Sequence, residues 1–453
     1  MALVIATVPV WGRVLYAANL PEAMNLSEEG VLTIQSGDVT DGLYDETQLR
    51  TIYLVFSQQD WWTQLTANYA AGVDIPADLT FEGVTYPGVG VRFRGFTSYS
   101  MIGNSQKKSF NITIDYTAPD LRLMGYSTLN LNNAHMDPSF IREALYFNVV
   151  RRYTPCPKVN FVKLVINGEN WGVYSNSEQI NSTLIKEWFL SADGDRWNAP
   201  VEVGGAVSDS TVINTGGQLP DTGDSTVVNT GGRQPNTGGG GFASGEKALM
   251  WLGADVAAYQ AAYEIKSAKS ADPWASLINT CNVLNNTSLD ALPDSLDMVM
   301  NVDRWLWFLA VENIFADDDS YLTKGADYSF YFEPESGQLH PLEHDGNESF
   351  LKKSTSLNPF DGETNANRPV ISRLMSVPEY RQRYIAHYRT ILNDYFEWTT
   401  LEPKITAYLT LIEEEVKADT KKLYTDAEFD NSSSELENFI TTRRSYLLQN
   451  TEL

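Results

Sequence analysis

Cysteine and histidine are scarce in this chain of 453 residues, which has two cysteines and four histidines. Cys156 and Cys281 provide neither a disulfide framework nor a zinc site, and whether they pair is open. The histidines show no metal-ligand spacing. His340 and His344 are four residues apart, but Pro341 excludes the helix that would bring them to one face. The chain therefore lacks the signatures of a zinc enzyme and of a disulfide-stabilised scaffold.

Long apolar runs and basic residues are also lacking. No stretch approaches the ~20 apolar residues that span a bilayer, and residues 1–12 fit a strand better than a signal peptide. The 58 Asp and Glu outnumber the 33 Lys and Arg, for a net charge of −25. Such a surface repels nucleic-acid phosphates and anionic lipids, so neither is an expected partner. It favours divalent metals or Lys/Arg-rich proteins, although the charge could serve solubility alone.

Familiar nucleotide and nucleophile motifs are absent as well. The chain has no Walker loop, no dinucleotide-binding fingerprint and no serine-nucleophile elbow. Any catalytic function must therefore rest on a different arrangement of residues.

The hydrophobic pattern divides the chain into a β-rich first part and a helical second part. Apolar or alternating runs predict strands at 51–56, 89–93, 109–115, 161–166 and 171–174. Asn167-Gly168 predicts a tight hairpin between the last two. Between the third and fourth strands, Asp137-Pro138 predicts the start of a helix over 137–153, with Asp137 as its N-cap.

Mainly helical patterns follow residue 245, with an apolar stripe from Val302 to Leu309 and further helices from Val370 onward. We therefore predict a bilobal α+β fold. It comprises an N-terminal extension (1–47), a β-rich N-lobe (48–180) and a helical C-lobe (181–453).

Residues 203–245 differ from the rest of the chain. The segment 209–223 recurs almost unchanged as 224–238 and is followed by a glycine run. A direct repeat of this composition cannot build a core, so we expect a flexible surface insertion in the C-lobe.

The segment 316–350 carries the most informative polar pattern. Three acids, Asp317 to Asp319, follow an apolar helix. Two predicted strands, 328–332 and 338–342, then lead to Asp345. Because a hairpin returns its ends to one edge, Asp345 is expected beside the Asp319 loop.

Paired acidic loops suit phosphoryl transfer, in which one carboxylate orients the attacking hydroxyl and another holds Mg²⁺ against the phosphates. A two-carboxylate glycosidase would fit the same spacing. A solvated helix cap is the alternative without chemistry.

Basic residues cluster in the β-rich part. Arg94 precedes a glycine and could contact a phosphate, and Lys108 shares strand parity with buried positions. Lys107 has the opposite parity. A lysine on an apolar face needs an anion, so Lys108 is the expected phosphate contact.

Two charged residues of the predicted helix could contribute to the same site. Glu143 could pair with Lys108, and Arg142 could face the phosphates. Surface positions are the alternative for both residues.

Taken in order, these motifs resemble the CotH kinase family, which is named for a spore-coat protein with a protein-kinase-like fold. The matching stretches are 91–95 with Ser98, 107–110, 137–142, 165–174 with Glu178, 318–321, Asp327-Tyr328 and 344–347. The resemblance covers about residues 48–425 apart from the repeat insertion.

The resemblance implies ATP-dependent phosphorylation of protein Ser or Thr hydroxyls with Mg²⁺ or Mn²⁺. It implies that Asp319 is the catalytic aspartate and that Asp345 binds the metal. Lys108 and Glu178 would contact the phosphates and lie near the adenosine, respectively.

Two positions depart from the family pattern. Asp327 stands where many members have asparagine, and Asn347 replaces the second acid of an Asp-x-Asp pair. Both keep an oxygen ligand, so metal binding should survive with altered strength.

Other readings stay open from the sequence. A nucleotide-binding scaffold of the cell envelope and a nucleotidyl transferase are both compatible with these motifs. The resemblance favours an extracellular or envelope location, and the net charge of −25 suits a Ser/Thr-containing, Lys/Arg-rich protein substrate. The sequence does not indicate an oligomeric state.

Overall fold

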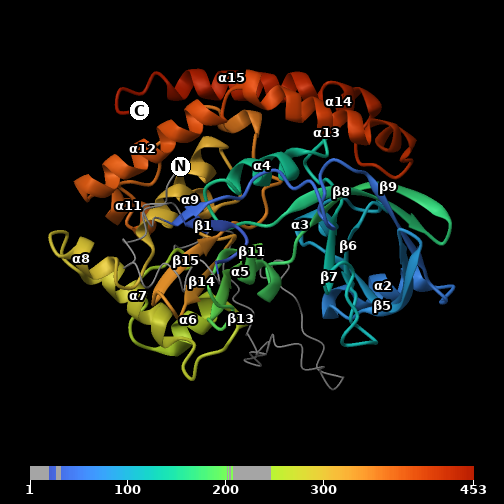
Figure 1. The fold of residues 1–453 in the computed structure, drawn as a ribbon, viewed down its shortest axis with the longest axis horizontal. Helices are drawn as coiled ribbons and strands as arrows, with labels where there is room; N and C mark the ends of the chain where they lie inside the picture. The colour runs from blue at the N-terminus through green and yellow to red at the C-terminus, as the bar shows by residue number, and fades with distance from the viewer. Residues whose placement is uncertain (1–19, 27–31, 201, 204–205, 208–245) are drawn as a thin grey trace.

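A computed structural model describes residues 20–26, 32–200, 202–203, 206–207 and 246–453. The strand predicted at 1–12 and the repeat at 209–238 lie outside these residues. The described chain is a mixed α+β protein with a β-rich N-terminal region and a helical C-terminal region, as the sequence predicted (Figure 1).

The β-rich region is a closed barrel of seven strands, in the order β3-β4-β5-β6-β7-β9-β8. Neighbouring strands are antiparallel except for β3 and β8, whose parallel pairing, with Arg50 opposite Val162, closes the barrel. The interior is filled by aliphatic and aromatic side chains, among them Ile52, Leu79 and Leu164. The strands are β3 (Arg50–Val55), β4 (Ile75–Phe81), β5 (Val84–Arg94), β6 (Ser109–Thr113), β7 (Thr128–Asn132), β8 (Val159–Ile166) and β9 (Glu169–Ser177).

The predicted hairpin between β8 and β9 is confirmed. Asn167 and Gly168 both have positive φ, at 51° and 82°, as the two central residues of a type I′ turn require. The Asn167 side chain also accepts a hydrogen bond from the main-chain N–H of Phe56 at 2.8 Å, which ties the turn to the end of β3.

A second sheet has the order β13-β10-β14-β15. Its strands are β10 (Arg196–Ala199), β13 (Glu264–Ser267), β14 (Tyr328–Glu333) and β15 (Gln338–Leu342). The last two form the predicted hairpin, in antiparallel register with Ser329 opposite Leu342. Near its open end lie the two acidic loops, residues 315–320 between α9 (Val302–Ile314) and α10 (Tyr321–Lys324) and residues 343–351 after β15.

The helix predicted over 137–153 is shorter than expected: α4 runs Arg142–Val150. Asp137 is not its N-cap. Its carboxylate instead accepts from the N–H and hydroxyl of Ser139 and from the N–H of Arg142. Phe140, with φ of 63°, breaks the helical path before Ile141. Residues 137–141, predicted as the first turn of the helix, therefore form a non-helical turn, and the helix begins at Arg142.

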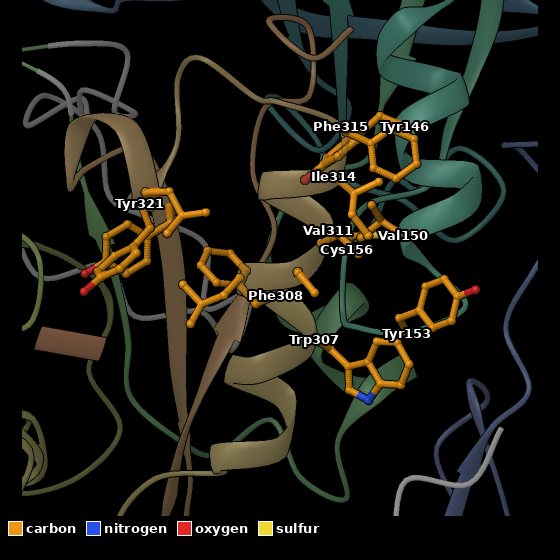
Figure 2. Close-up of a cluster of buried hydrophobic side chains, with 14 of the residues drawn as sticks. Tyr146, Val150, Tyr153, Cys156, Trp307, Phe308, Val311, Ile314, Phe315 and Tyr321 are labelled. Carbon is orange, nitrogen blue, oxygen red and sulfur yellow. The ribbon is translucent and has the colours of Figure 1, made fainter. Parts of the chain in front are cut away.

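Helix α4 packs against α9 (Val302–Ile314), the helix that leads to the acidic loop (Figure 2). Tyr153 stacks on Trp307 with ring centroids 4.7 Å apart, and Tyr146 meets Phe315 edge to face. Cys156 lies in the same core, and both cysteines are buried free thiols. The core thus fixes α4 relative to the acidic loop.

The C-terminal helices arch over this core and reach the barrel (Figure 1). They are α11 (Pro369–Met375), α12 (Pro378–Asp394), α13 (Trp398–Ala418), α14 (Asp426–Asp430) and α15 (Ser432–Leu447). Helix α13 packs against β9. No helix in the described ranges has the length and apolar character needed to cross a membrane.

Smaller elements complete the described chain. They are β1 (Met24–Leu26), β2 (Leu32–Ile34), α2 (Trp61–Asn68), α3 (Thr97–Ser100), α5 (Ser182–Trp188), β11 (Glu202–Val203), β12 (Ala206–Val207), α6 (Val256–Ala262), α7 (Ala275–Asn286), α8 (Leu292–Leu296) and α10 (Tyr321–Lys324), with two short 3-10 turns at 69–71 and 352–354.

Candidate functional site

The two acidic loops lie side by side, as the hairpin pattern predicted. The main-chain N–H of Asp318 donates to the carbonyl of Glu348 at 3.4 Å. The N–H of Phe350 donates to the carbonyl of Phe315 at 2.9 Å. These bonds hold the loop that follows α9 against the loop that follows β15. Residues about thirty positions apart in the chain thus share one site.

Asp327, which directly precedes β14, repels a carboxylate in each of the two acidic loops. Burial, followed by repulsion from Asp327, raises the pKa of Asp319 to about 8. The same two causes, in the same order, raise the pKa of Asp345. Carboxylates that raise each other's pKa are stabilised in their ionised form by a nearby cation. The arrangement therefore favours a cationic ligand.

Asp327 and Asp345 share an unusual backbone conformation. Their φ angles are 60° and 53°, in the left-handed region that residues with a side chain rarely occupy. Such strain costs on the order of 1 kcal/mol or more and persists where the surrounding structure enforces it. Asp327 directly precedes β14 and Asp345 follows the end of β15, so both strained positions lie at the open end of the β14–β15 hairpin.

The two oxygens of Asp319 have different surroundings. Oδ2 forms an ion pair with Nζ of Lys324 at 2.7 Å. Oδ1 is buried and has no hydrogen-bond partner among the described residues. An unpaired buried carboxylate oxygen costs free energy unless a ligand completes it. Asp319 is therefore poised to receive a hydroxyl or a cation.

A divalent cation fits these residues only in part. Within the described ranges, no three His, Cys, Asp or Glu side chains form a ready metal site. Mg²⁺, however, is commonly held by one or two carboxylates together with substrate phosphates. Two carboxylates on strained turns, beside an unpaired carboxylate oxygen, suit that mode of binding.

The rim of the barrel adds a polar chain to the site. Arg94, at the end of β5, donates to the side-chain oxygen of Asn132 at the end of β7. The Asn132 amide donates to both carboxylate oxygens of Glu143 at 3.0 Å. Burial, then repulsion from Asp345, raises the pKa of Glu143 to about 7. Asp345 thus interacts electrostatically with both Glu143 and Arg94.

Lys108 does not join this chain, and the predicted ion pair between Lys108 and Glu143 is wrong. Its ammonium donates to the main-chain carbonyls of Tyr99 and Gly103, at 2.9 and 3.1 Å, and lies over the Tyr99 ring. The loop that contains it therefore satisfies this lysine. Strand parity did predict that Lys108 is buried, but not which groups would surround it.

Lys107, which parity assigned to the opposite face, is the more buried of the two lysines. Its ammonium donates to Oδ2 of Asp419 at 2.7 Å and to the carbonyl of Trp171 at 2.6 Å. Parity failed here because residues 107 and 108 precede β6 and do not continue its pleat.

The remaining predicted residues have diverse surroundings. The Ser98 carbonyl accepts from the Asn133 amide, which also holds the Lys107 carbonyl. Arg142 donates to the carbonyl of Met136. The N–H of Asn347 donates to Oδ1 of Asp345 at 3.5 Å. Only Asn347 among these directly contacts a predicted metal ligand.

Glu178 directly follows β9, and its place at a hinge near the adenosine stays a prediction. Its Oε2 accepts from the N–H of Lys158 at 3.1 Å, and its Oε1 is buried without a partner among the described residues. Burial raises the pKa of Glu178 to about 7, despite nearby Lys158.

Sequence reasoning missed three residues of the site as assembled. Asn132 links Arg94 to Glu143, His344 lies 3.6 Å from Asp327 (Nδ1 to Oδ1), and Lys324 pairs with Asp319. His344 stood in a quoted motif, and the Asn132-Asn133 pair at a strand end was a usable signal. Lys324 had no signal, because its role depends on a turn of α10.

A family model described as CotH kinase protein matches residues 91–447, which is most of the chain. The match includes both acidic loops, Arg94 and Glu143. No curated protein matches the chain.

Proposed function

The chain belongs to the CotH kinase family, and on this basis we propose that it transfers the γ-phosphoryl group of ATP to a Ser or Thr hydroxyl of a protein. The observation that carries the proposal is the convergence of Asp319, Asp327 and Asp345 from three loops, with Oδ1 of Asp319 unpaired. We further propose that the nucleotide lies between the barrel rim and these loops, in the bilobal manner of a protein kinase.

Asp345, Asp327 and Asn347 are the residues that would hold Mg²⁺ or Mn²⁺. A bound divalent cation would neutralise phosphate charge as the phosphoryl group transfers. The strained turns at Asp327 and Asp345 fix the two carboxylates in advance. The family's more usual asparagine at 327 and acid at 347 are exchanged here, so two oxygen ligands remain.

Asp319 would orient the acceptor hydroxyl and take its proton on Oδ1. The acceptor oxygen forms its bond to the γ-phosphorus as the bond from that phosphorus to the β,γ-bridging oxygen breaks, and ADP leaves with the electron pair. Positioning of this kind accounts for much of the rate in phosphoryl transfer. The protein therefore has little covalent chemistry to perform.

The barrel rim would supply the remaining phosphate contacts. The charge of Arg94 opposes the rise that burial causes in the pKa of Asp345, and a guanidinium suits two-point contact with a phosphate. Ser98, in α3, would add a further phosphate contact. Glu143 and Asn132 would hold Arg94 in place. Lys108 would hold the segment that contains Tyr99 and Gly103, beside Ser98. Glu178 would lie toward the adenosine. Arg142 would support α4.

The acceptor would be a protein rich in Lys, Arg and Ser. The net charge of −25 favours such a partner over an acidic one. Basic and acidic Ser-containing peptides, compared at low ionic strength, test this preference. Equal rates for both would remove charge as the basis of selection.

Separate labelling of ATP at the α and γ positions tests the proposed reaction. We expect Mn²⁺- or Mg²⁺-dependent transfer of the γ label alone, and its loss in Asp345→Asn, a change that keeps a side chain suited to positive φ. Transfer of the α label would instead indicate a nucleotidyl transferase. An ATP-dependent rise in melting temperature without transfer would indicate a binding scaffold. Metal-independent cleavage of sugars would indicate a glycosidase.

A further inference from the structure

Lys324 contacts the proposed catalytic aspartate, although no sequence motif drew attention to it. Its ammonium lies 2.7 Å from Oδ2 of Asp319, and both side chains are largely but not fully buried, at 21% and 14% exposed. The ion pair occupies one carboxylate oxygen and leaves the other, Oδ1, without a partner. Lys324 therefore occupies Oδ2, and Oδ1 is the carboxylate oxygen of Asp319 that still lacks a partner among the described residues.

The helix that carries Lys324 is a single turn, α10, which is too short to be stable alone. Ser320 caps its start in a capping box with Thr323. The Glu312 carboxylate, from α9, also accepts from the N–H groups of Tyr321 and Leu322 at 3.1 and 3.3 Å. The two carboxyl oxygens thus satisfy two of the free N–H groups at the start of the turn, and burial raises the pKa of Glu312 to about 8.

The other end of α10 is held by a cation. Arg368, which directly precedes α11, donates to the carbonyls of Leu322 and Thr323 at 3.2 and 3.1 Å. Its guanidinium also fills the space beside Gly325, where a Cβ would come within 2.5 Å of Arg368 Nη1. Gly325 has φ of 68° and ends the turn. Elements distant in the chain thus hold both ends of this four-residue helix.

A turn held at both ends by buried polar side chains can place a lysine within narrow limits. Glu312 and Arg368 are 2% and 6% exposed, so their hydrogen bonds are shielded from water and cost free energy to break. An ordinary surface ion pair lacks such buried supporting hydrogen bonds and contributes at most about 1 kcal/mol to stability. Contacts at both ends of α10 therefore hold Lys324 beside Asp319.

We propose that Lys324 is a positioning residue of the phosphoryl-transfer site: it holds Asp319 through Oδ2 and presents Oδ1 to the acceptor hydroxyl, while Glu312 and Arg368 hold the turn that carries it. This inference rests on the proposed function. It assigns Lys324 no contact with ATP, so loss of Lys324 should lower kcat and leave ATP binding in place.

The neighbouring pair of Lys353 and Asp318 provides a matched control. Lys353 Nζ lies 2.5 Å from Oδ2 of Asp318, one residue before Asp319, but the lysine is 61% exposed. Lys353→Met removes one lysine charge from the 3-10 turn at 352–354, beside the same acidic loop, without altering the contacts of Asp319. The comparison separates positioning of Asp319 from a general change in charge.

The test compares wild type, Lys324→Met, Lys324→Arg and Lys353→Met in steady-state transfer of the γ label. We expect Lys324→Met to lower kcat by about 10- to 100-fold, because a misplaced catalytic group costs rate of this order. The KM for ATP and the rise in melting temperature with Mn²⁺ and ATP should change less than about twofold, as expected for a site whose ATP contacts are intact. Lys324→Arg should restore part of kcat, and Lys353→Met should keep wild-type kcat.

A second variant, Arg368→Lys, keeps the charge but cannot hold two carbonyls in the same way. Arg368→Lys should also lower kcat, but by a smaller factor than Lys324→Met.

The outcomes separate this inference from the proposed function. If wild type transfers phosphate and Lys324→Met keeps its kcat, the inference is wrong and the function stands. An equal loss in Lys353→Met would also overturn it. If wild type transfers no phosphate from ATP, the proposed function fails and takes the inference with it.

Discussion

Two lysine–aspartate pairs with the same N–O distance have different surroundings in this molecule. Lys107–Asp419 joins the barrel to the segment after α13, and Lys324–Asp319 lies at the acidic loops; each pair is 2.7 Å apart. Both partners of the first pair are fully buried, whereas both partners of the second retain some exposure. Distance alone therefore does not distinguish a structural pair from a functional one.

The difference lies in how completely the remaining polar atoms are satisfied. In the first pair, Lys107 also donates to the carbonyl of Trp171 and lies over the Tyr174 ring, and Oδ1 of Asp419 accepts from the N–H of Lys421 at 2.7 Å. In the second pair, Oδ1 of Asp319 is buried without a partner among the described residues. The first pair is thus fully hydrogen-bonded, whereas the second has a carboxylate oxygen that a ligand could complete, as we propose.

The largest expected effect is on activity, at the incomplete pair. Asp319→Asn should lower phosphoryl transfer by about 10³-fold, because loss of a positioned proton acceptor typically costs 10²- to 10⁴-fold. Its melting temperature should stay level or rise, since one of several mutually repelling carboxylates is removed. Initial rates with γ-labelled ATP and thermal unfolding measure the two effects. If Asp319→Asn keeps wild-type activity but melts at a clearly lower temperature, the Lys324–Asp319 pair is structural and Asp319 is not catalytic.

The next effect is on stability, at the complete pair. Asp419→Ala should lower the free energy of unfolding by about 3 kcal/mol, because it leaves the Lys107 ammonium buried without its counter-ion. The double variant Lys107→Met with Asp419→Leu should recover most of this loss. Urea unfolding at pH 7.5 measures both. If the double variant is as unstable as the single one, packing rather than charge accounts for the loss.

A smaller effect is the pH dependence that Lys107 contributes. Burial lowers its folded-state pKa to about 8, and Asp419 offsets this only in part; the pKa of an unfolded lysine is about 10.4. Between these values the unfolded state binds more protons, so this group's contribution to stability rises with pH.

Compared with Lys107→Met, wild type should therefore gain about 2 kcal/mol between pH 7.5 and 9.5. Urea unfolding of both proteins at the two pH values measures the difference. A relative loss of wild-type stability over this range would show that the folded-state pKa of Lys107 is raised.

The smallest effect is the stability change in Lys324→Met. The pair is partly exposed and one of its carboxylate oxygens is unsatisfied, so its loss should change the free energy of unfolding by less than about 1 kcal/mol. Urea unfolding under the conditions used for Asp419→Ala provides the comparison. A loss as large as that of Asp419→Ala would show that Lys324 is mainly structural.

The sequence was most informative where one local signal determines the structure. The Asn167-Gly168 turn and the β14–β15 hairpin were predictable because turn chemistry and strand alternation act over a few residues. From the hairpin followed the approach of the two acidic loops. Strand β4 was missed because Pro76 and Asp78 interrupt its pattern, and closure of the barrel was missed because the parallel pairing of β3 with β8 joins distant segments.

The site was less predictable where contacts cross the molecule. Lys107 and Lys108 are adjacent, yet one pairs with Asp419, 312 positions away, and the other with carbonyls of its own loop. The partner of Lys324 depends on how α10 is held by Glu312 and Arg368. No local pattern encodes such tertiary choices.

Binding of Mn²⁺ with a non-hydrolysable ATP analogue tests the central claim most directly, because it does not depend on an acceptor protein. Calorimetric titration would compare wild type, Asp345→Asn and the double variant Lys107→Met with Asp419→Leu. We predict that wild type and the double variant bind with similar affinity and that Asp345→Asn binds at least about tenfold more weakly, a difference of about 1.4 kcal/mol. Equal affinity for all three proteins would contradict the assignment of the acidic loops as the nucleotide and metal site.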